Sequence, residues 1–182
     1  LIVERTKAGL QAAKKRGSYT DADRQFQASL KEADAFDEKD ERVRDTMRQL
    51  AELKELRGKL TEAAEVWAKV LALDEKVRGA SSPELGEDLT YYASVQRKLG
   101  KLNDAEQSAT RAVAIFEKKS DQTAHLLDAL KALGVVYQSA GKYTEAEATF
   151  KKALSIAEKT GAKTGGAFTA PQLELLAALY KD

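Results

Sequence analysis

The side chains that could do chemistry in this chain are few. Its 182 residues include one histidine, His125, and no cysteine, so the usual histidine and thiolate ligands of a zinc site are missing. Two aspartates lie within four residues of His125, and we interpret this histidine as a surface or packing residue and not as a base or a metal ligand. Ser81 and Ser82 follow no predicted strand, which a nucleophilic serine on a strained turn would need. We expect them to cap a helix that begins at Pro83.

Charge and composition exclude further classes of protein. The 30 lysines and arginines nearly balance the 29 aspartates and glutamates, which argues against nucleic-acid binding because such binders carry a basic excess. The longest apolar runs, such as LLAALY, are far shorter than the roughly 20 residues of a membrane-spanning helix. The glycines of GAKTGGAF do not have the order of a phosphate-binding loop. We therefore predict a soluble protein that is not an enzyme, holds no cofactor or metal, and does not insert into membranes.

A fourfold internal repeat dominates the sequence. The segments RGSYTDADRQF, RGKLTEAAEVW, LGKLNDAEQSA and AGKYTEAEATF align on Gly17, Gly58, Gly100 and Gly141, which are 41, 42 and 41 residues apart. A threonine or asparagine follows each glycine after three residues, and an alanine after five. The constant period predicts a repeat protein and not one globular core.

Each repeat is predicted to form two helices with a turn at the glycine. The glycine ends the first helix by adopting the left-handed conformation. The expected N-caps of the second helices are Thr20, Thr61, Asn103 and Thr144, with Glu106 and Glu147 completing capping boxes in the last two. The alanine lets the two helices approach closely, and the bulky residue four positions later, such as Phe150, is expected to fill the space between repeats.

This pattern resembles the tetratricopeptide repeat, in its long kinesin-light-chain-like variety. The linker EKVRGASSPELGEDL, residues 75–89, has its glycine and proline where that variety has them. The resemblance implies an all-α fold, an α-solenoid with a right-handed superhelix of antiparallel helix pairs. We expect one domain over residues 1–182, with repeats at about 3–43, 44–85, 86–126 and 127–168 and a terminal helix at about 171–182. A glycine-rich, mobile linker, residues 158–172, precedes that helix, which either caps the array or marks the point where a longer array continues.

The resemblance also implies a concave groove lined by the first helix of each repeat. We predict the groove residues on the face opposite the packing stripe, where Glu87 and Asp128 also lie. The predicted set is Lys7, Gln11 and Lys14, then Arg48, Glu52 and Glu55, then Thr90, Tyr91, Ser94 and Arg97, and finally Lys131, Val135 and Gln138. This lining is polar and of mixed charge. It predicts an extended or helical peptide of mixed charge as the ligand, and the alternative is that these are simply exposed helix positions.

Two ligand sites known from the family are not implied for this chain. In the carboxylate clamp for chaperone tails, Lys7 fits the first position. The other clamp positions checked hold Gln11, Gln49, Glu87 and Tyr91. The adjacent asparagines of kinesin-light-chain repeats are replaced by Arg48–Gln49, Thr90–Tyr91 and Lys131–Ala132. Association with kinesin is therefore not expected.

These observations predict a non-catalytic scaffold that binds a partner protein or peptide. Two alternatives stay open: a regulatory or sensor fragment of a larger multidomain protein, and a component that forms homo-oligomers through its terminal repeat. The first residue, Leu1, and the unpaired terminal helix favour a piece of a longer chain. The sequence does not assign a compartment, and the cytoplasm is favoured.

Overall fold

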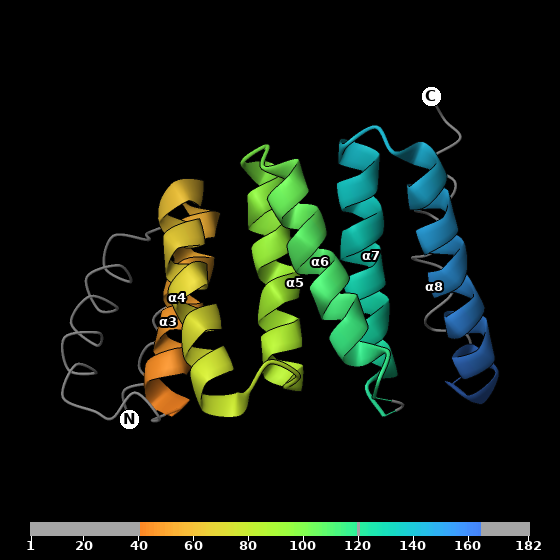
Figure 1. The fold of residues 1–182 in the computed structure, drawn as a ribbon, viewed down its shortest axis with the longest axis horizontal. Helices are drawn as coiled ribbons and strands as arrows, with labels where there is room; N and C mark the ends of the chain where they lie inside the picture. Colours follow the sequence, from red (N-terminus) through yellow and green to blue (C-terminus); the bar gives the residue numbers. More distant parts are fainter. Residues whose placement is uncertain (1–40, 120, 165–182) are drawn as a thin grey trace. The chain divides into compact units, whose positions relative to one another are not determined.

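A computed structural model describes residues 41–119 and 121–164, with side chains up to residue 160. These ranges form six α-helices and no strand, as Figure 1 shows. The chain divides after Ala80 into two compact units. The described helices of the first unit are α3 (Glu41–Leu56) and α4 (Leu60–Arg78), and those of the second are α5 (Pro83–Lys98), α6 (Leu102–Phe116), α7 (Thr123–Ser139) and α8 (Tyr143–Thr164). The predicted all-α repeat fold is confirmed. The predicted first repeat and terminal helix lie outside the described residues, so the division into four repeats stays a prediction.

The turn inside each helix pair has one geometry in all three described pairs. Gly58, Gly100 and Gly141 have φ of +71°, +75° and +71°. Each glycine N–H donates to the carbonyl three residues before it, and the N–H of the lysine that follows donates to the carbonyl five residues before it. This is the Schellman arrangement, which a residue with a Cβ atom adopts only under strain. The predicted glycine stop is confirmed.

The second helices begin differently from the prediction. Thr61, Asn103 and Thr144 are the second residues of α4, α6 and α8 and not their N-caps. In α4 and α6 the cap is the lysine after the glycine, and its side chain makes no capping hydrogen bond. The reason is that this lysine takes part in both helices. Its N–H closes the turn that ends the first helix. Its carbonyl accepts the first hydrogen bond of the second helix from the alanine four residues later, as from Ala63 N to Lys59 O at 2.9 Å.

The predicted capping role of Glu106 is also wrong. Its carboxylate instead accepts a hydrogen bond from Lys142 Nζ, at 2.6 Å, which joins α6 to the turn between α7 and α8. At the start of α5, by contrast, Ser82 Oγ accepts a hydrogen bond from Leu85 N at 3.2 Å, and Pro83 is the first helical residue. The predicted serine cap is therefore confirmed.

Glycines in the first helices make room for aromatic rings from the second helices. A Cβ atom on Gly134 of α7 would lie 2.2 Å from Cε1 of Phe150 on α8, and one on Gly86 of α5 would lie 2.8 Å from Cζ of Phe116 on α6. Phe150 thus packs against the first helix of its own repeat, and whether it also fills the space toward the next repeat stays a prediction, because the helix predicted at 171–182 lies outside the described residues. The missing side chain of Gly134 lets the ring reach the backbone of α7.

The last described helix is longer than predicted. The helix α8 continues to Thr164, so the linker predicted from residue 158 is helical over its first seven residues, and the rest of that linker lies outside the described residues. One internal glycine costs a helix about 1 kcal/mol, which weakens this extension but does not by itself end it.

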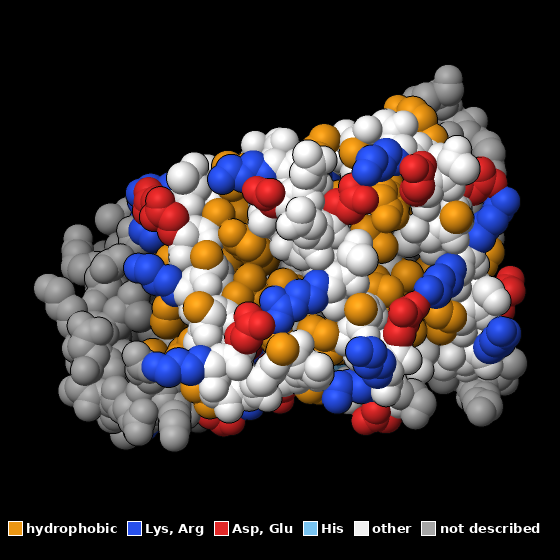
Figure 2. Space-filling view, viewed as in Figure 1, with side chains coloured by type: hydrophobic (Ala, Val, Ile, Leu, Met, Phe, Trp, Pro, Cys, Tyr) orange, Lys and Arg blue, Asp and Glu red, His pale blue; other side chains and the backbone are white. Residues whose placement is uncertain are grey.

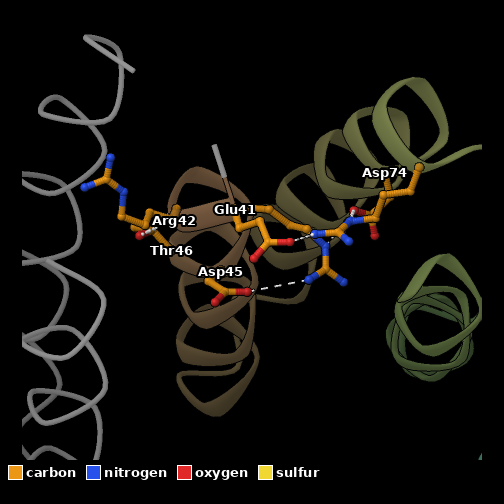
Figure 3. Close-up of polar contacts among 7 residues, drawn as sticks. Glu41, Arg42, Asp45, Thr46 and Asp74 are labelled. Atoms are coloured by element: carbon orange, nitrogen blue, oxygen red, sulfur yellow. Dashed lines mark hydrogen bonds and ion pairs between the residues drawn. The ribbon is translucent and has the colours of Figure 1, made fainter. Parts of the chain in front are cut away.

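A buried charge cluster joins α3 to α4 in the first unit. Arg44 Nε lies 2.6 Å from Asp74 Oδ1, and the Asp74 side chain is 1% exposed. Neither atom is aligned for a hydrogen bond, so the contact is a close charge pair. Arg78 lies 2.8 Å from Glu41 and 3.5 Å from the same Asp74 oxygen. Figure 3 shows the two acidic side chains, Glu41 and Asp74, of this cluster. Removing one member would leave a buried charge without its partner.

The described surface carries both signs of charge. On the face that Figure 2 shows, lysine and arginine side chains lie among aspartate and glutamate side chains, with hydrophobic side chains between them. This mixing agrees with the balanced composition. Within residues 41–164, apart from Ser120, no helix is long and apolar enough to cross a membrane.

Candidate functional site

A cavity of about 570 Å³ opens on the second unit beside α5 and α7. These two helices run in the same direction and pack against each other, with α6 packed against both (Figure 1). The lining residues are Glu87, Thr90, Tyr91, Ser94 and Arg97 from α5, Phe116 from α6, and His125, Asp128, Lys131, Ala132 and Val135 from α7.

The structure brings together most of the groove residues predicted for the two repeats of this unit. Thr90, Tyr91, Ser94 and Arg97 line the cavity from α5, and Lys131 and Val135 line it from α7. Gln138, one turn beyond Val135, does not line it.

The other predicted groove residues do not line this cavity. Arg48, Glu52 and Glu55 lie on α3, in the first unit. Lys7, Gln11 and Lys14 lie outside the described residues. A binding role for any member of the set stays a prediction.

Glu87 and Asp128, which the sequence places on the predicted face, also line the cavity, and three further lining residues were not predicted. Ala132 follows from the period, because it lies 41 residues after Tyr91. Phe116 comes from a second helix and reaches the cavity through the space that Gly86 leaves open, which no helical-face pattern reveals. His125 was interpreted as a surface or packing residue. It does pack on a neighbouring ring, and it also lines the cavity.

His125 connects three helices at the cavity. Its Nε2 atom lies 2.9 Å from Glu87 Oε1 of α5. Its ring stacks on Phe116 of α6, with centroids 5.5 Å apart and an interplanar angle of 21°. The His125 and Glu87 side chains are 41% and 31% exposed, so solvent screens their interaction in part.

Other cavity side chains are available to a ligand. Within the described chain, Arg97, Asp128 and Lys131 form no ion pair, and the last two are exposed. The Tyr91 ring is 49% exposed, which is unusual for a large aromatic side chain and typical of binding surfaces. The cavity therefore presents free charges of both signs beside an accessible ring.

Two ion pairs outside the cavity each change the pKa of one of their members. Hydrogen bonds from Lys59 and Lys54 lower the pKa of the Glu62 carboxyl to about 2. The hydrogen bond to Glu106 raises the pKa of Lys142. Both shifts favour the charged form of a residue that ties neighbouring helices together.

His125 makes no hydrogen bond to a hydroxyl group of the described residues, so it is not set to activate a serine, threonine or tyrosine there. The same residues contain no group of three histidine or acidic side chains placed to hold a metal ion.

Comparison with known proteins identifies the repeat. Two family models of the tetratricopeptide repeat match residues 42–118 and 129–164, together more than half of the chain. No curated protein matches the chain in sequence. Repeats of this family are typically non-catalytic and take part in protein–protein interaction.

Several solved structures share the fold. BtubC (BKLC) from P. vanneervenii has a TM-score of 0.84 at 21% identity over 98% of this chain and 72% of its own. The nearly identical TPR-like repeats of a kinesin light chain from Podosopora anserina give 0.81 at 19% identity, over 98% of this chain and 87% of theirs. The apo form of RapI gives 0.80 at 18% identity, over 100% of this chain and 64% of its own. At these identities the similarity is one of fold, and the chain belongs to the tetratricopeptide repeat family, with the fold of its kinesin-light-chain-like variety.

Proposed function

We propose that this protein is a non-catalytic interaction module and that the cavity beside α5 and α7 binds a segment of a partner protein. One observation carries the proposal. Two successive first helices contribute to a single cavity six side chains that the repeat pattern assigns to a groove. If these were only exposed helix positions without a binding role, nothing would require them to line the same cavity.

The dimensions of the cavity suit a short peptide. Its end residues on α5, Glu87 and Arg97, are ten positions apart, which corresponds to about 15 Å along a helix. An extended chain rises about 3.3 Å per residue, so four or five residues of a partner would span this length. A cavity of 570 Å³ lies in the usual range for ligand sites.

The lining indicates the chemistry of the segment. Arg97 and Lys131 offer donors to carboxylates, Asp128 offers an acceptor to a cation, and the Tyr91 ring with Val135 offers apolar contact. We therefore expect a peptide with charged side chains of both signs around an apolar one.

We further propose that the binding surface extends along the whole array. The constant period supports one domain over residues 1–182, with four repeats and a terminal helix. In that arrangement Arg48, Glu52 and Glu55, and before them Lys7, Gln11 and Lys14, would continue the lining.

Filling the cavity tests the proposal. The substitutions Ser94→Trp and Val135→Trp place two indole rings at the cavity wall, and a control chain carries Ala68→Trp and Ala148→Trp at exposed positions outside it. Proteins retained by the native chain are purified, and their affinities for the three chains are measured by calorimetry. We expect the filled chain to bind at least tenfold more weakly and the control to bind as the native chain does. Equal affinity of all three chains, with unchanged circular dichroism, would overturn binding in this cavity.

A further inference from the structure

The single histidine of the chain lies where three helices meet at the proposed groove. Glu87 of α5 holds it through a contact of 2.9 Å, and Phe116 of α6 holds it through ring stacking. Phe116 is itself buried, with its ring beside Gly86. The imidazole of His125 is thus positioned by both neighbouring helices while it stays accessible to protons from solvent.

Protonation changes the strength of this contact. An ordinary histidine side chain gains its charge between pH 8 and pH 5, where aspartate, glutamate, lysine and arginine side chains keep theirs. The Glu87 carboxylate is charged throughout this range, so protonation of the imidazole adds a Coulomb attraction between opposite charges to a contact that is already 2.9 Å long. The link between α5 and α7 is therefore stronger at pH 5.5 than at pH 7.5.

Protonation also changes the net charge of the cavity. The charged and titratable groups that face it are Glu87, Tyr91 and Arg97 from α5 and Asp128 and Lys131 from α7, while α6 contributes the uncharged Phe116 ring. Two carboxylates and two cations balance in this set, so a protonated His125 leaves one positive charge in excess. A ligand that presents a carboxylate is attracted more strongly to this form.

We propose that His125 and Glu87 form a proton-controlled latch. Acidification strengthens the contact between Glu87 of α5 and His125 of α7, and it raises the affinity of the groove for a peptide segment that carries a carboxylate. The effect on affinity rests on the proposed function, whereas the latch itself belongs to the folded chain and can be tested without a partner.

Three substitutions separate the latch from a structural role of the same residues. His125→Gln keeps a hydrogen-bond donor but does not titrate in this range. Glu87→Gln keeps an acceptor and the titrating histidine but removes the negative charge. His125→Lys keeps a positive charge at both pH values.

The test uses the full chain in two measurements. Urea unfolding at pH 5.5 and pH 7.5 gives the unfolding equilibrium constant, which we expect to be about two- to fivefold smaller at pH 5.5 in the native chain, as for a partly exposed ion pair. This difference should vanish in all three variants. Because the chain has one histidine, its imidazole Cε1–H gives a single NMR signal that follows the histidine alone in the native chain and in Glu87→Gln.

The latch and the proposed groove binding are refuted by different results. A native chain whose unfolding does not respond to this pH change, or a Glu87→Gln chain that responds as the native chain does, would overturn the latch. Groove binding fails on a separate result, when filling the cavity leaves partner affinity unchanged.

Discussion

Replacing Gly134 with alanine tests how closely the two helices of a repeat approach. The added Cβ atom would lie 2.2, 2.6 and 2.7 Å from three ring carbons of Phe150. Carbon atoms in contact normally lie about 3.5–4.0 Å apart, so the ring must retreat by more than about 1 Å. Phe150 is fully buried, and a shift of this size in a close-packed core costs about 1–3 kcal/mol. Alanine favours the helix over glycine by about 1 kcal/mol, which leaves a net loss of up to about 2 kcal/mol in the free energy of unfolding.

The ring itself provides the control. Phe150→Ala alone should cost about 3–5 kcal/mol because it leaves a cavity in the core. In that background the clash is gone, so Gly134→Ala should stabilise the chain by about 1 kcal/mol through helix propensity. The glycine substitution therefore changes from destabilising to stabilising, and the coupling free energy of the double-mutant cycle is about 1–3 kcal/mol.

Urea unfolding followed by circular dichroism at 222 nm measures these free energies. Trp67, the single tryptophan, is fully buried on α4, so its fluorescence reports the first unit separately. Gly86→Ala offers a graded comparison, because its nearest ring carbon is at 2.8 Å and its cost should be smaller. The same sign for Gly134→Ala with and without the Phe150 ring would refute the packing explanation.

Three further predictions concern ion pairs and a helix cap. Glu62 has its pKa lowered to about 2, below its ordinary value of 4.5, so its contribution to stability is present above about pH 4.5 and is lost as the pH falls toward 2. In Glu62→Gln, urea midpoints measured across that range should therefore depend less on pH than in the native chain, and an unchanged dependence would contradict the shift. Asp74→Asn leaves buried arginine charge without its carboxylate and should cost about 3 kcal/mol in urea unfolding, whereas a neutral result would show that the cluster is solvated. Ser82→Ala removes the cap of α5 and should cost about 1 kcal/mol, with Ser82→Asp expected to restore it.

The turns and the helix pairs could be predicted from sequence because they depend on local chemistry. A glycine that must adopt positive φ is visible in the sequence, and Gly58, Gly100 and Gly141 each do so. The capping residue was not predictable in this way, because the Schellman turn and the next helix share one lysine. The start of the second helix is set by the backbone hydrogen bonds of this lysine, which outweigh the capping preference of a threonine or asparagine two residues later.

The groove lining could be predicted for a similar reason, whereas its internal contacts could not. Which face of a helix points into the groove follows from the period. The partner of His125 depends on the neighbouring repeat. Subtracting the period of 41 places His125 at the level of Glu84, one turn from Glu87 on the adjacent helix, so a signal for the pair was present in the sequence. The stacking of His125 on Phe116 required the structure, because the ring passes through the space left by Gly86.

The difference between equivalent positions is what gives this groove a direction. Residues that lie 41 positions apart occupy matching places on α5 and α7, yet Thr90 is matched by Lys131 and Ser94 by Val135. The backbones of α5 and α7 are therefore equivalent, whereas the side chains that the two helices contribute to the cavity differ in charge and polarity. If the proposed peptide bound in the reverse direction, its charged and apolar groups would lie against the wrong helix, and charges would be left unpaired. Under the proposed function, specificity would come from the positions where the repeats differ, whereas stability comes from the glycines, alanines and rings that the repeats share.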